Sequence, residues 1–101
     1  MDLNLIINTI LKEKTRIEYM LERYRKIIDD LPKGSLSESN KNGQKYYYLK
    51  YRDGKKIVSK YLGKEPGDML MLIEKRKHTE AMIKSLENEL RIAKKALEGN
   101  I

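Results

Sequence analysis

The chain has 101 residues, which is the size of a single domain. It contains no cysteine, which excludes a disulfide framework and thiolate chemistry, and its net charge of +7 excludes a mimic of DNA. No secretory signal is visible and no apolar run approaches the roughly 20 residues that span a bilayer, so we expect a soluble cytoplasmic protein without a membrane partner.

Residues 3–31 are predicted to form one helix, followed by a loop. Asp2 suits the cap at the start, and Pro32 stops the helix. Residues 33–44 are rich in serine, asparagine and glycine, which predicts a mobile connection. The apolar side chains of the helix recur at heptad spacing in a row made of Leu3, Ile10, Ile17, Tyr24 and Leu31.

Residues 45–62 are predicted to form a β-hairpin. Asp53-Gly54 lies between two β-prone runs, which is the pattern of a two-residue type I′ turn and would pair Arg52 with Lys55. A three-residue loop with a bulge would shift these partners by one. The more aliphatic face, with Leu49 and Val58, is expected to rest on the helix ends. The other face would carry Tyr46, Tyr48, Lys50, Arg52, Lys55, Ile57, Ser59 and Tyr61.

Residues 66–98 are predicted to form a second helix, antiparallel to the first. Pro66 suits the first helical position, and Asp68 suits the positive end of the helix dipole. The fold class is therefore α+β and dominated by helix, with two long antiparallel helices joined by a two-stranded β-hairpin.

The predicted pair of helices has a thin core, and its apolar stripe is wider than one partner helix needs. We therefore expect a homodimer, and the alternative is a monomer whose β-hairpin folds back onto the helices. The residues that widen the stripe are Ile7, Leu21, Ile28, Ile73, Met82 and Ala96.

The positive charge gathers in the middle third of the chain, together with the tyrosines. Residues 33–67 carry nine basic and three acidic side chains, and five of the seven tyrosines lie within residues 46–61. Bases stack on aromatic rings while lysine and arginine hold phosphates, so the pattern favours nucleic-acid binding. The alternative is structural, because tyrosine is a favoured strand residue and lysine protects strand edges. The residues predicted to bind nucleic acid are Lys45, Tyr46, Tyr48, Lys50, Arg52, Lys55, Lys56, Lys60 and Tyr61.

The sequence offers no candidate for catalysis. His78 is the single histidine, with no cysteine to share a metal, and no nucleophile–base pair or phosphate-cradling loop is evident. We therefore expect no enzyme, no metal site and no cofactor.

Four short motifs carry a resemblance to a known family. They are Gly34-Ser35-Leu36, Tyr46-Tyr47-Tyr48-Leu49, Gly54-Lys55 and Tyr61-Leu62-Gly63. In this order they resemble a family of small bacterial and phage proteins known as a domain of unknown function, over about residues 31–65. The Tyr-Leu-Gly ending also looks like segments of some transposases and, more loosely, like arm-type DNA-binding domains of integrases. The resemblance implies a mobile-element setting and contact with nucleic acid.

We therefore expect a non-enzymatic nucleic-acid-binding protein of bacterial or phage origin, which uses the basic, tyrosine-rich hairpin. Two alternatives belong to other classes. One is a phage-encoded inhibitor of a host defence nuclease, of anti-CRISPR type, which a pull-down of the nuclease would reveal. The other is a coiled-coil adaptor in which the hairpin is only a stable cap. The sequence leaves the choice between DNA and RNA open.

Overall fold

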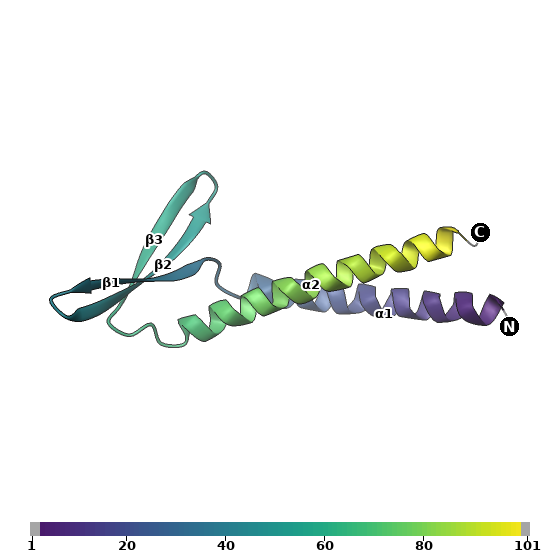
Figure 1. Cartoon of the computed structure of the whole chain (residues 1–101), viewed down its shortest axis with the longest axis horizontal. Coiled ribbons are helices and arrows are strands. Elements are labelled where there is room, and N and C mark those ends of the chain that lie inside the picture. The colour runs from purple at the N-terminus through teal and green to yellow at the C-terminus, as the bar shows by residue number, and fades with distance from the viewer. Residues whose placement is uncertain (1–2, 100–101) are drawn as a thin grey trace. The chain divides into compact units, whose positions relative to one another are not determined.

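The computed structural model describes residues 3–99 and shows a helix-dominated α+β protein (Figure 1). The predicted class is confirmed, with helices of 27 and 30 residues against strands of 7, 10 and 8 residues. Two compact units share the chain, one of α1 with α2 from Thr79 onward and one from Asp30 to His78. In chain order the elements are α1 (Leu3–Asp29), β1 (Ser35–Lys41), β2 (Gln44–Asp53), β3 (Lys56–Gly63) and α2 (Met69–Glu98).

The helical unit pairs α1 with the second part of α2. Ile17 and Leu21, one turn apart on α1, form a buried cluster with Leu86 of α2. An ion pair of 3.1 Å between the Arg25 guanidinium and the Glu87 carboxylate joins the same two helices. Met20, Tyr24, Ile83 and Leu90 pack around the cluster. Ile17 and Tyr24 of the predicted heptad row therefore lie in a packed seam in this unit.

Both helices are shorter than predicted, α1 at its C-terminal end and α2 at its N-terminal end. Helix α1 ends at Asp29 rather than at residue 31. Helix α2 begins at Met69 rather than at residue 66, because Gly67 has a left-handed φ of 59° and the Asp68 carbonyl accepts the bond from the Leu72 amide at 3.0 Å. The predicted cap at Asp2 lies outside the described residues.

The sheet has three strands in the order β1-β2-β3, so the prediction of a two-stranded hairpin was wrong. Most of the predicted loop 33–44 is strand β1, which pairs antiparallel with β2 from Ser35↔Lys50 to Lys41↔Gln44. Asn42 and Gly43 connect the two strands with φ values of 53° and 80°. Two successive positive φ angles are the mark of a type I′ turn, whose twist suits a tight hairpin.

The second turn lies one residue later than predicted. Strands β2 and β3 pair Asp53 with Lys56, which makes Gly54-Lys55 the two-residue connection. Only Gly54 has a positive φ, of 62°, as a type II′ turn requires. The strand partners therefore shift by two, and because an even shift preserves the alternation of side chains, the predicted faces of the two strands are retained. A bulge between Tyr47 and Tyr48 ends this regular pairing.

Candidate functional site

The sheet has two faces with different chemistry. Alternation along each strand and the observed register assign every strand side chain between Ser35 and Tyr61 to one face or the other. The face that carries Tyr46, Tyr48 and Tyr61 is called here the tyrosine face, and the face that carries Leu49 is called the leucine face. The remaining members of the tyrosine face are Ser35, Ser37, Ser39, Lys41, Gln44, Lys50, Arg52, Ile57 and Ser59.

Three aromatic rings meet on the tyrosine face. The centroid of the Tyr61 ring lies 5.4 Å from that of Tyr48 and 6.4 Å from that of Tyr46, with interplanar angles of 53° and 37°. These distances and tilts are those of favourable aromatic pairs. The rings and Lys41 line a shallow hollow. Strand pairing of Tyr48 with Tyr61 brings the rings together, since directly opposed side chains share a face.

The tyrosine face carries no carboxylate within the described strands. Its three charges are the cations Lys41, Lys50 and Arg52. The strand carboxylates, Glu38 and Asp53, both fall on the leucine face by the same alternation. Positive charge on the tyrosine face is therefore not offset by a neighbour on that face.

The structure separates the nine residues that the sequence singled out. The tyrosine face receives five of them: Tyr46, Tyr48, Lys50, Arg52 and Tyr61. Lys45, Lys56 and Lys60 fall on the leucine face, and Lys55 occupies the turn beside Gly54. The Lys45 ammonium group lies 3.8 Å from the Glu38 carboxylate, so part of its charge is already matched.

Sequence reasoning missed Lys41 as a site residue. Lys41 is the last residue of β1, a strand that the sequence presented as a loop, and it lies at the hollow beside the three rings. The Asn42-Gly43 pair next to it is the signal that could have placed it, because Asn-Gly strongly favours a two-residue hairpin turn.

The leucine face carries the buried side chain of the sheet. Leu49 is 6% exposed, whereas Ile57 on the tyrosine face is 71% exposed. A second hollow on this side is lined by Pro32, Lys33, Leu49, Tyr51 and Lys60. Burial of Leu49 shows that this face contributes to the core, whereas Ile57 and Tyr61 leave apolar surface exposed on the tyrosine face.

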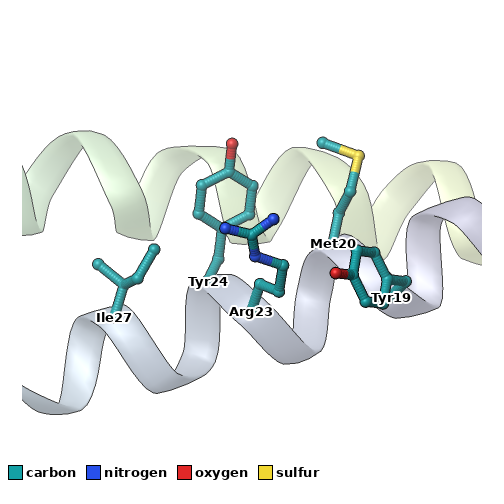
Figure 2. Close-up of a pocket in the computed structure, with 5 residues that line it drawn as sticks. All are labelled: Tyr19, Met20, Arg23, Tyr24 and Ile27. Carbon is teal, nitrogen blue, oxygen red and sulfur yellow. The ribbon is translucent and has the colours of Figure 1, made fainter.

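A third hollow belongs to the helical unit and contains none of the predicted site residues. It lies along α1 and is lined by Tyr19, Met20, Arg23, Tyr24 and Ile27 (Figure 2). The Arg23 guanidinium carbon lies 5.9 Å from the centre of the Tyr19 ring, a cation–π distance. Arg23 and the Tyr24 hydroxyl give this mainly apolar hollow a polar rim.

The described residues define a small α+β protein with a helical pair and an antiparallel sheet that bears a basic aromatic face. The chain belongs to the family described as domain of unknown function DUF6788, whose model matches residues 9–70. No curated protein and no solved structure matches the chain.

Residues 3–99 contain no group of three histidine, cysteine, aspartate or glutamate side chains placed to hold a metal ion. Within the same range, neither helix is long and apolar enough to cross a membrane.

Proposed function

We propose that this chain is a non-enzymatic nucleic-acid-binding protein of bacterial or phage origin that acts in the cytoplasm, and that the tyrosine face is its binding surface. The observation that carries the proposal is the separation of charge between the two faces. Three cations share the tyrosine face with three clustered rings, while Glu38 and Asp53 lie on the other side. A polyanion that approaches the tyrosine face meets cations and aromatic surface without an opposing carboxylate.

Three further points support the proposal. The rings offer surface for stacking, since Tyr61 is 56% exposed. The cations lie at the ends of the ring cluster, with Lys41 beside the hollow and Lys50 and Arg52 farther along β2. The resemblance of Tyr61-Leu62-Gly63 to transposase segments adds a mobile-element setting to the proposal.

The experiment compares two variants with the same loss of charge. One replaces Lys41, Lys50 and Arg52 of the tyrosine face by glutamine, and the matched control replaces Lys45, Lys56 and Lys60 of the leucine face by glutamine. Binding of labelled single-stranded and double-stranded DNA and RNA is measured by fluorescence anisotropy at about 50 and about 200 mM salt.

We expect the tyrosine-face variant to bind at least about tenfold more weakly at the lower salt. The slope of its log affinity against log salt concentration should become shallower, by an amount that corresponds to the loss of about two to three phosphate contacts. The control should keep most of its affinity, because its lysines act only through the general field of the protein. Equal losses in the two variants would contradict the assignment to one face. Absence of binding by the unchanged protein would reject the function, and a nuclease recovered by pull-down would then favour the inhibitor class.

A further inference from the structure

We propose that the ligand of the tyrosine face is single-stranded nucleic acid, and that an unpaired base stacks on Tyr61 in the hollow lined by Lys41, Tyr46, Tyr48 and Tyr61. This inference rests on the proposed function and narrows it to one class of nucleic acid.

The Tyr61 ring is placed to receive a flat partner. It packs against two rings, with centroids 5.4 and 6.4 Å away, and still has 56% of its surface exposed. Tyr46 and Tyr48 are half-buried and support it from the neighbouring strand. A ring that is held by two others and open toward a hollow has its conformation fixed before a ligand arrives, so stacking costs little conformational entropy.

An exposed ring face fits an unpaired base better than a duplex. Bases in a duplex are covered on both faces by their neighbours and present only their edges in the grooves. Stacking a ring on such a base requires that a base step be opened, which costs free energy that a single strand does not require. Rings form the centre of the tyrosine face, where a base would stack. The Arg52 guanidinium lies away from this centre, four residues along β2 from Tyr48 and near the turn.

The rest of the tyrosine face can hold the backbone of the same strand. Lys50 and Arg52 follow Tyr48 by two and four residues on β2, which places them roughly 7 and 13 Å farther along the sheet. Lys41 borders the hollow at the other end. Ser37 and Ser39 lie opposite Tyr48 and Tyr46 and supply hydroxyl groups for sugar or base edges. A single strand that follows β2 would meet a cation, the rings and two further cations in turn.

The experiment uses the full chain and one sequence of about 12 nucleotides. Fluorescein-labelled single-stranded DNA, single-stranded RNA and the blunt DNA duplex are titrated at about 50 mM salt. We expect one of the single strands to bind at least about tenfold more tightly than the duplex. Tyr61→Leu, which keeps apolar bulk and removes the ring, should weaken single-strand binding by about 5- to 150-fold, whereas Tyr61→Phe should stay within about twofold. The control Tyr51→Leu removes a ring from the leucine face of the same sheet and should retain binding.

The outcomes separate this inference from the proposed function. Duplex binding that equals or exceeds single-strand binding would overturn the inference and leave nucleic-acid binding standing. Binding of neither form would overturn both. Single-strand binding that Tyr61→Leu leaves unchanged, or that Tyr51→Leu weakens equally, would overturn stacking on Tyr61. Melting curves of each variant test whether the sheet remains folded, and we expect Tyr61→Leu to remain folded because the Tyr61 side chain is exposed.

Discussion

Gly34 is the residue on which the start of the sheet depends. Its φ is 112°, which side chains of L-residues rarely adopt, and a Cβ at this position would collide with the Lys50 carbonyl oxygen. Gly34 directly precedes Ser35, the first residue of β1, which pairs with Lys50. The close approach of backbone to backbone therefore explains why glycine begins the Gly34-Ser35-Leu36 motif.

We expect Gly34→Ala to destabilise the protein by more than about 3 kcal/mol, because backbone strain and the collision with β2 add together. The matched control is Gly43→Ala. Gly43 also has a positive φ, of 80°, but nothing lies within 4 Å of a Cβ there, so the cost should be about 1–2 kcal/mol of strain alone. Urea unfolding followed by circular dichroism measures both variants, and equal losses would show that the collision at Gly34 is relieved by movement of the strand.

At the scale of elements, the sequence predicted both helices and the two strands β2 and β3 but missed β1. The helices were recognisable because their apolar residues repeat at helical spacing and pack as a seam around Leu21. Strand β1 has the sequence Ser-Leu-Ser-Glu-Ser-Asn-Lys, with one apolar residue, Leu36. Its strand conformation comes from pairing with β2 and from the Asn42-Gly43 turn, so composition alone suggested a loop.

The candidate site was partly predictable, because alternation along a strand assigns its side chains to faces. The faces of β2 and β3 depend only on alternation, so the grouping of Tyr46, Tyr48 and Tyr61 survived an error in the turn. The placement of Glu38 and Lys41 depends on β1, which carries Lys41 on the tyrosine face and Glu38 on the leucine face. Without that strand, the sequence could not assign these two side chains to a face.

The buried seam of the helical unit gives a prediction at the same scale. Leu21 is 2% exposed within the cluster of Ile17 and Leu86, so Leu21→Ala should lower the free energy of unfolding by about 2–5 kcal/mol. Leu70→Ala on α2 is the control, because Leu70 is half exposed and should change stability by less than about 1 kcal/mol. Thermal denaturation distinguishes the two, and a small effect at Leu21 would mean that the seam repacks around the lost side chain.

At the scale of the whole molecule, apolar surface remains on α1 after the chain has folded. Leu21 and Ile73, two of the residues that widened the predicted stripe, are each 2% exposed in the single chain. Neither side chain therefore has surface left to bury against a second copy of the chain. Three of the exposed apolar residues on α1, Leu5, Tyr19 and Ile27, are instead separated by about four and two helical turns, which places them on one flank of the helix. This flank contains the hollow between Tyr19 and Ile27 (Figure 2).

We expect a homodimer that covers this flank, since an apolar strip on a long helix is stabilised by burial against another helix. Sedimentation equilibrium between about 1 and 100 µM should show a dimer, and Tyr19→Lys with Ile27→Lys should shift it to monomer. Ile57→Lys on the sheet, at an apolar position that is more exposed than Tyr19 or Ile27, should leave the dimer intact. A monomer throughout this concentration range would contradict the expectation.

The charge of a surface without carboxylate or imidazole groups stays constant over the pH range in which most protein surfaces change charge. Aspartate, glutamate and histidine ordinarily change charge between about pH 3 and 8, and the tyrosine face contains none of them in the described strands. Affinity for nucleic acid at fixed ionic strength should therefore vary by no more than about twofold between about pH 5.5 and 8.5. A steep change near neutrality would place a titrating group in the binding surface. With a flat profile, acidification of the cell would not release the bound strand, and release would depend on salt or on a competing polyanion.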